Sequence, residues 1–302
     1  MVEAFRPSSL AEALAIRQGK AAIPFAGGTD LMVKLGRGAG VLPGFEAPVL
    51  FLDGCEELRG LSLIDGALEI GSMVSLAALA ESPLVHPALR EIAHSMGGPA
   101  IRNAATLGGN ICNASPAGDT LPFLYAFEAS VKLVSSSSER ALPVADFLKG
   151  PGATRLERGE ILRSVLVPDW RPRVVFWRKV GTRKANALTK VSIAAFADME
   201  EGRPCRVRIS LGAVAPTVVR LPDVERMLEE ALEEKRAAAS VRAGAGSDAL
   251  LQRIGAAALA RAKPIDDQRS TAEYRRGVAA NLVAEFARRA LAGALAGAGT
   301  GR

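Results

Sequence analysis

Cysteine and histidine are scarce in this chain of 302 residues. Its three cysteines, Cys55, Cys112 and Cys205, lie far apart and show no C-x-x-C spacing. This scatter argues against a disulfide framework, a zinc site or an iron–sulfur cluster held by this chain. Two histidines, His86 and His94, are too few for most metal sites or catalytic triads. We therefore expect no metal in this chain, and we expect both histidines to be structural residues on a helix or at its end.

Long apolar runs are also lacking, because charges or glycines interrupt each run well short of a membrane span. The opening residues, MVEAFR, place an acid and a base before any apolar stretch and so do not resemble a signal peptide. The composition, 49% hydrophobic and 23% charged, is that of a globular protein with room for two or three subdomains. We expect a soluble, cytoplasmic protein.

The net charge is a mild +6, and bases are mixed with acids except over residues 171–190. A nucleic-acid site would interleave such bases with aromatic residues or place them in a known module, and neither is visible. The basic strip is compatible with a phosphate-bearing cofactor, a protein partner, or the solvated face of an ordinary sheet. Its members are Arg171, Arg173, Arg178, Lys179, Arg183, Lys184 and Lys190.

In the first half of the chain, the pattern predicts a small α/β layer followed by hairpins. A Ser-capped helix over 8–18 precedes a strand at 21–26, and a second strand falls in 48–54. Asp65-Gly66 then joins two alternating runs as a hairpin, Ser75 begins a helix, and another helix covers 87–95. A further hairpin lies between residues 129 and 148. The stretch between the helix at 87–95 and this hairpin, GGPAIRNAATLGGNICNASPAGD, shows no periodicity and predicts a long loop of functional importance.

In the second half, three strands and then helices are expected. The segments RPRVVFWRKVGTR, LTKVSIAAFADME and CRVRISLGAVA read as one antiparallel sheet after about residue 170. Apolar residues at helical spacing follow residue 221, and Ser270 with Glu273 predicts a capping box at the start of the last helix. The glycine-rich end, 291–302, is expected to be a frayed tail.

Two glycine pairs are the strongest chemical signal. Gly27-Gly28 ends an apolar run and is followed by Thr29-Asp30, while Gly108-Gly109 lies between Thr106 and Asn110. Paired glycines let a ligand approach main-chain N–H groups, and successive N–H groups facing one concavity suit a diphosphate. Neither pair matches the Rossmann or P-loop pattern, and either pair alone is more often a plain turn.

The combination of the two pairs favours a dinucleotide site. Ser115 and Asp119 follow the second pair closely and can bind sugar hydroxyls, and EILRSVLVP supplies a later apolar wall. A dinucleotide offers a diphosphate, hydroxyls and flat rings to these three features.

Five segments, in order, carry a resemblance to a known family. They are PFAGGTDLMV, IRNAATLGGNICNASPAGD, GEILRSVLVP, RKVGTRKANALTKVSIAA and DDQRSTAEYRR. The chain resembles, from about Phe5 to Tyr274, the FAD-binding medium subunit of molybdenum hydroxylases, as in bacterial xanthine dehydrogenase and carbon monoxide dehydrogenase.

The resemblance implies an α+β fold. A two-subdomain FAD-binding domain of the vanillyl-alcohol-oxidase (PCMH) type would span 1–170, with subdomains at about 1–55 and 56–170. An antiparallel sheet with helices would span 171–290 and resemble the C-terminal domain of the carbon monoxide dehydrogenase flavoprotein. A flexible tail would follow at 291–302.

The resemblance also implies which residues bind FAD. The first diphosphate loop would be Phe25, Ala26, Gly27, Gly28, Thr29, Asp30 and Leu31, and the second Thr106, Gly109 and Asn110. Ser115 and Asp119 would contact the sugar or ribityl portion, and Leu162 would line the nucleotide pocket. Lys179 would approach the flavin ring, with Arg178 or Trp177 as alternatives there. Cys112 is expected to be a small packed side chain.

The implied activity is electron relay. A small subunit with two [2Fe-2S] clusters and a large subunit with the molybdenum cofactor would complete the enzyme, as a dimer of heterotrimers. This chain would pass electrons from FAD to NAD, a quinone or another acceptor. Two alternatives are a stand-alone FAD-dependent reductase, such as the cell-wall enolpyruvyl reductase, and a non-catalytic scaffold subunit without flavin.

Overall fold

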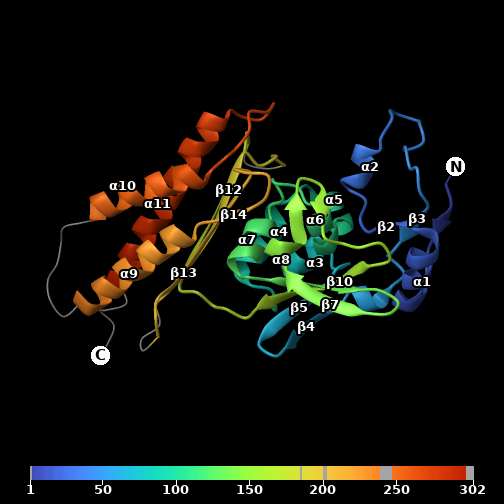
Figure 1. Cartoon of the computed structure of the whole chain (residues 1–302), viewed down its shortest axis with the longest axis horizontal. Coiled ribbons are helices and arrows are strands. Elements are labelled where there is room, and N and C mark those ends of the chain that lie inside the picture. Colours follow the sequence, from blue (N-terminus) through green and yellow to red (C-terminus); the bar gives the residue numbers. More distant parts are fainter. Residues whose placement is uncertain (1, 184–185, 200–202, 239–246, 297–302) are drawn as a thin grey trace. The chain divides into compact units, whose positions relative to one another are not determined.

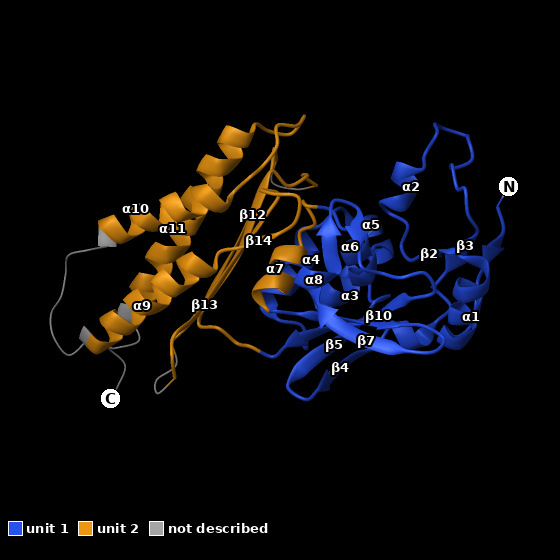
Figure 2. Ribbon diagram, viewed as in Figure 1, with its two compact units in different colours: residues 1–115, 128–169 blue, residues 116–127, 170–302 orange. Residues whose placement is uncertain are grey.

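The computed structural model describes residues 2–183, 186–199, 203–238 and 247–296. The chain forms two compact units, coloured separately in Figure 2. Unit 1 consists of Met1–Ser115 and Glu128–Asp169, and unit 2 of Pro116–Phe127 and Trp170–Arg302. No helix in the described part of the chain is long and apolar enough to cross a membrane.

Unit 1 begins with a parallel three-stranded sheet, in the order β1-β3-β2. Its strands are β1 (Ala4–Phe5), β2 (Ile23–Phe25) and β3 (Val49–Phe51), and its helices are α1 (Leu10–Lys20), α2 (Leu31–Lys34) and the 3-10 turn η1 (Glu56–Leu58). Helix α1 confirms the predicted Ser-capped helix, since the Ser9 hydroxyl accepts from the Glu12 N–H. Strand β2 is shorter than predicted, because Ala21 ends α1 in the left-handed region at φ 51°.

The second sheet of unit 1 is antiparallel, in the order β4-β5-β10-β6-β7. Asp65 and Gly66 both adopt positive φ, 49° and 75°, which suits the predicted tight hairpin turn. His86 confirms its predicted helix-end position, as its Nδ1 accepts from the Ala88 N–H at 3.1 Å. Its strands are β4 (Leu61–Ile64), β5 (Ala67–Gly71), β6 (Ser130–Val134), β7 (Glu139–Pro143) and β10 (Ile161–Pro168). The same part of the chain contains the helices α3 (Leu76–Glu81), α4 (Pro87–Ser95) and α8 (Val144–Phe147), and a separate antiparallel pair of strands, β8 (Leu148–Gly150) and β9 (Ala153–Thr154).

The prediction of one long loop over residues 97–119 is wrong. It contains two short helices, α5 (Pro99–Ala104) and α6 (Leu107–Cys112). Each spans little more than one turn and a half, so neither repeats its apolar positions often enough to produce a helical pattern. Pro99 opens α5, and Thr106 caps α6.

Unit 2 confirms the predicted antiparallel sheet followed by helices, and adds a fourth strand. The sheet order is β11-β12-β13-β14. Helices α9, α10 and α11 cover one face, and α7 packs on β12 and β13 (Figure 1). The elements are α7 (Leu121–Ala126), β11 (Val174–Val180), β12 (Val191–Asp198), β13 (Arg206–Gly212), β14 (Val219–Arg220), α9 (Pro222–Ala238), α10 (Ser247–Arg261) and α11 (Ala272–Ala296).

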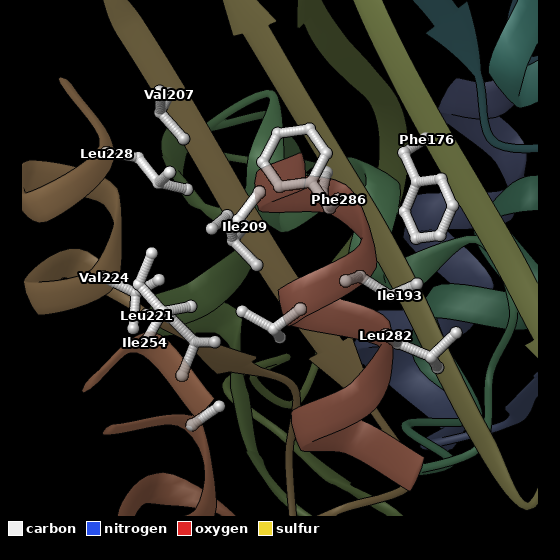
Figure 3. Close-up of a cluster of buried hydrophobic side chains, with 14 of the residues drawn as sticks. Phe176, Ile193, Val207, Ile209, Leu221, Val224, Leu228, Ile254, Leu282 and Phe286 are labelled. Atoms are coloured by element: carbon white, nitrogen blue, oxygen red, sulfur yellow. The ribbon is translucent and has the colours of Figure 1, made fainter. Parts of the chain in front are cut away.

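The core of unit 2 lies between the sheet and its three helices. Figure 3 shows Phe176, Ile193 and Ile209 on the strands meeting Leu282 and Phe286 of α11. All but Leu282, which is 9% exposed, are at most 1% exposed. Alternate residues of β12 face this core, as strand geometry requires, so the other residues face α7.

Three glutamates of α9 bind the edge of β13. They recur at every fourth position and therefore share one face of the helix. Each carboxylate accepts one main-chain N–H along the edge that β14 leaves unpaired: Glu225 from Ile209 at 2.8 Å, Glu229 from Val207 at 2.8 Å, and Glu233 from Cys205, the residue before β13, at 2.6 Å. The helix thus satisfies an open strand edge with side chains.

The start and end of α11 differ from the sequence predictions. The capping residue is Thr271, whose hydroxyl accepts from the Tyr274 N–H at 3.2 Å, so the capping box on Ser270 is wrong. The Ser270 N–H instead donates to Asp267. The helix continues to Ala296, through the first half of the stretch predicted to fray, and residues 297–302 lie outside the described residues.

Candidate functional site

The first glycine loop leaves the sheet of unit 1 at the end of β2. Phe25 anchors it, with its ring centroid 4.9 Å from that of Phe51 and 6.4 Å from that of Phe45. Gly28 adopts φ +68°, and a Cβ on it would lie 2.2 Å from the Phe25 ring. The chain reverses over its own aromatic anchor, which only glycine permits at this position.

The second glycine loop lies directly against the first. A Cβ on Gly27 would lie 1.9 Å from the carbonyl oxygen of Ala104, and the next nearest atoms are also main chain. A Cβ on Gly109 would lie 3.8 Å from that of Ala26. The two loops, separated by about eighty residues in sequence, therefore lie against each other, and Gly27 allows their close approach.

Main-chain donors are concentrated in the first loop. Among the described residues, no acceptor receives the N–H groups of Gly27, Gly28, Thr29, Asp30 or Leu31. The loop is half-buried to exposed rather than sunk in the core. Five successive donors without an internal acceptor suit an anionic group, such as a diphosphate.

The second loop is held from behind. The Thr106 hydroxyl accepts from the Gly109 N–H at 3.0 Å, and the Gly108 N–H donates to Ser72 O at 3.0 Å. Thr106 is 4% exposed, so its side chain shapes the loop and is already engaged. Asn110, the residue after Gly109, is half-buried.

A polar network that the sequence did not reveal connects the loops. The Asn113 amide donates to the Asp30 carboxylate at 2.5 Å, and Lys34 donates to the Asn113 side-chain oxygen. The Asp30 carboxylate is thereby bound to the residue that caps the end of α6. Asn113 and Lys34 both lie within a few residues of the glycine pairs, and that proximity was the available signal.

Two further candidate residues lie in unit 1. Leu162 is 4% exposed on β10, beside an irregularity in the β10–β6 register between Leu162 and Ser164. Ser115 is half-buried at the end of the first segment of unit 1.

The last two candidates meet in unit 2. Lys179 on β11 donates to Asp119 Oδ2 at 2.5 Å. The other carboxylate oxygen of Asp119 accepts from the Thr189 hydroxyl at 2.5 Å. The Asp119 side chain is buried, at 7% exposed, and the Lys179 side chain is partly buried, at 13% exposed. Sequence reasoning missed Thr189, because no local motif marks a residue 70 positions from its partner.

Strand geometry separates Arg178 from Trp177 and Lys179, the three alternatives for the flavin-facing position. Residues alternate across a strand, so Trp177 and Lys179 share the face that carries Asp119, and Arg178 takes the opposite face. The Arg178 guanidinium lies 5.3 Å from the centroid of the Phe176 ring, on the side of the helices. The alternative Arg178 therefore does not join the Asp119 cluster.

One cysteine, Cys112, ends helix α6 of the second loop. Cys55, Cys112 and Cys205 are free thiols. Cys112 is half-buried, and desolvation raises its pKa to about 12, which keeps the thiol protonated. No group of three or more metal-ligating side chains occurs within the described ranges.

Comparisons with known proteins match both halves of the chain. The family model described as the FAD binding domain in molybdopterin dehydrogenase matches residues 1–170, and that of the CO dehydrogenase flavoprotein C-terminal domain matches residues 177–290. The xanthine dehydrogenase FAD-binding subunit of Escherichia coli O157:H7 is 31% identical over 233 residues, covering 75% of this chain and 78% of that protein.

Two further relatives are similar over nearly their whole length. The carbon monoxide dehydrogenase medium chain of Hydrogenophaga pseudoflava is 29% identical over 287 residues, covering 92% of both chains. The solved structure of quinoline 2-oxidoreductase from Pseudomonas putida 86 superposes with a TM-score of 0.81 at 25% identity, covering 98% of each chain.

Proposed function

Because this chain belongs to the FAD-binding medium subunits of the molybdenum hydroxylases, we propose that it relays electrons through FAD within a larger molybdenum enzyme. The observation that carries the proposal is the run of five N–H donors at 27–31, set against the second glycine loop. A side chain at Gly27 would push these loops apart, so the arrangement depends on the glycine.

Each residue has one proposed task. The N–H groups of Gly27, Gly28 and Thr29 bind the FAD diphosphate, and the Asn110 side chain binds it from the second loop, where Gly109 leaves room for its approach. Phe25, Ala26 and Leu31 support the first loop on the apolar side, and Thr106 fixes the second through its cap. Asp30 contributes through its bond to Asn113.

The remaining assignments concern the flavin and its sugar portions. Leu162 lines the nucleotide pocket, and Ser115 binds a hydroxyl. Asp119 binds the ribityl portion, and Lys179 approaches the flavin ring. Both residues keep this capacity within their ion pair, because Lys179 uses one of three N–H donors and Asp119 two of about four acceptor positions.

Bound FAD supplies the redox chemistry, accepting electrons and passing them on, while the protein binds and tunes it. The proposed route brings electrons from [2Fe-2S] clusters of a small partner subunit, and the large partner subunit carries the molybdenum cofactor. NAD is the proposed acceptor, with a quinone as the alternative. The proposed assembly is a dimer of such heterotrimers in the cytoplasm.

The test is a visible absorption spectrum of the purified full chain, with the released nucleotide identified after denaturation. We expect the bands of oxidised flavin and FAD as the only flavin released. A colourless chain that also fails to take up added FAD would favour the scaffold without flavin.

A second measurement separates the relay from a stand-alone reductase. The FAD-loaded chain is mixed anaerobically with its co-expressed partner subunits and then with NADH. NADH drives the proposed route in reverse, so reduction of the partner's iron–sulfur clusters through the flavin supports the relay. It also supports NAD as the acceptor when the route runs forward. Turnover of an enolpyruvyl substrate by the chain alone would support the reductase instead.

A further inference from the structure

The buried cluster of Asp119, Lys179 and Thr189 contains a residue that the family comparison does not assign. Thr189 is 2% exposed and lies two positions before the start of β12, and its hydroxyl donates to Asp119. Asp119 in turn accepts from Lys179 on β11. The three form one chain of polar contacts from three different segments of unit 2.

Asp119 sits on a segment that is fixed to the sheet at both ends. Ala213 N–H donates to Pro116 O at 2.8 Å, and an Arg220 guanidinium N–H donates to Tyr125 O at 3.0 Å. Between these points, a Cβ on Gly212 would lie 2.9 Å from Pro122, so the segment lies close against β13. The main chain around Asp119 is thereby anchored.

Anchoring the main chain still leaves the carboxylate free to turn about its side-chain torsions. With both oxygens engaged, one by Thr189 and one by Lys179, that rotation is fixed. The ammonium of Lys179 ends a long flexible stem, and its position is set by the carboxylate that it meets. A hydroxyl at Thr189 can therefore determine where the Lys179 charge lies.

We propose that Thr189 is a positioning residue that orients Asp119 and, through it, fixes the ammonium of Lys179 toward bound flavin. This inference rests on the proposed function, since it assumes that the chain binds FAD. A fixed positive charge beside a redox group favours the more negatively charged, reduced form. Thr189 is thus expected to influence the midpoint potential of the flavin as well as its affinity.

Thr189→Val tests the proposal in the full chain, because valine keeps the shape and removes the donor. Loss of a hydrogen bond to a charged group is expected to weaken FAD binding about tenfold and to shift the midpoint potential to a lower value. Affinity is measured by titrating the apo chain with FAD, and potential by spectroelectrochemical titration of the loaded chain.

Two matched variants make the result specific. Thr189→Ser keeps the hydroxyl and should restore both affinity and potential, which a merely space-filling role of the threonine methyl would not predict. Thr217→Val makes the same change at a half-buried threonine of unit 2 and should alter neither quantity.

The outcomes separate this inference from the proposed function. If the unaltered chain binds no FAD, the proposed function fails. If the unaltered chain binds FAD and Thr189→Val leaves both its affinity and its potential unchanged, the positioning role of Thr189 is overturned while the proposed function stands. A fall in affinity that Thr189→Ser does not restore also overturns it.

Discussion

The glycine loops of unit 1 and the Asp119 cluster of unit 2 are built in opposite ways. The loops depend on missing side chains, since Gly27 and Gly28 admit main-chain atoms where a Cβ would collide. The cluster depends on three side chains whose polar atoms satisfy one another. A backbone site is sensitive to added atoms, whereas a side-chain site is sensitive to the removal of atoms and of charge.

The largest effect is expected where an atom is added to the loops. Gly27→Ala places a Cβ within 1.9 Å of the Ala104 carbonyl oxygen, and only separation of the two loops relieves the clash. We expect FAD affinity to fall at least about a hundredfold and the free energy of unfolding to fall by about 1–3 kcal/mol. Equilibrium dialysis with FAD and urea unfolding measure the two.

Two control variants keep that experiment interpretable. Gly60→Ala adds the same methyl where no atom lies within 4 Å, and it should leave FAD binding intact. Gly109→Ala places its Cβ 3.0 Å from the Thr106 hydroxyl and 3.8 Å from the Ala26 Cβ, with no main-chain clash, so it should fold and still lose affinity. Unchanged affinity in a folded Gly27→Ala chain would remove the first loop from the site.

The cluster should respond to removed charge instead. Asp119→Asn leaves the Lys179 ammonium without its counter-ion in a buried position, and we expect a loss of about 3 kcal/mol in unfolding free energy. The double variant Asp119→Asn with Lys179→Met removes both charges and should recover most of that loss. Both tryptophans, Trp170 and Trp177, lie in unit 2, so their fluorescence in urea reports this unit.

The single variant Lys179→Met completes the double-mutant cycle. If the losses of unfolding free energy in Asp119→Asn and Lys179→Met add up in the double variant, the two charges do not depend on each other, and the cluster is not held by its ion pair. FAD affinity is measured on the same variants. Each should bind FAD more weakly than the unaltered chain, and an unchanged affinity of Asp119→Asn would remove Asp119 from the binding site.

The same contrast explains what the sequence could and could not predict. Gly27 and Gly28 form a local signal, and the helix caps at Ser9 and Ser75 are equally local. Thr189 and Lys179 meet Asp119 across 70 and 60 positions of sequence, which only the folded sheet brings together. The short helices α5 and α6 were not predicted for a different reason, because six residues are too few to show a helical period.

A smaller effect is expected at the cap of the second loop, where a side chain shapes a backbone site. Thr106→Val removes the acceptor of the Gly109 N–H and should cost about 1 kcal/mol of stability. FAD affinity should fall with it, whereas Thr106→Ser keeps both. If valine retains full affinity, as judged by FAD titration, the second loop does not need its cap.

The smallest expected effect concerns acid titration, which distinguishes ion pairs from backbone sites. Glu160, 6% exposed, accepts from Arg140 at 2.6 and 2.9 Å. The Arg140 hydrogen bond, opposed by burial and aided by the Glu157 N–H, lowers the pKa of Glu160 in the folded chain. A lowered folded pKa contributes stability above the unfolded value of about 4.3 that is lost as pH falls through the folded one.

Glu160→Gln should therefore lower the free energy of unfolding at pH 7 and at pH 5 alike, and the difference from the unaltered chain should shrink below about pH 4. Far-UV circular dichroism in urea follows it, since no tryptophan lies in unit 1. Glu139→Gln breaks the Arg163 pair, whose side chains are 43% and 44% exposed, and solvent-screened pairs contribute little. A difference that is equal for both variants, or that grows in acid, would show that Glu160 does not hold unit 1 through its charge.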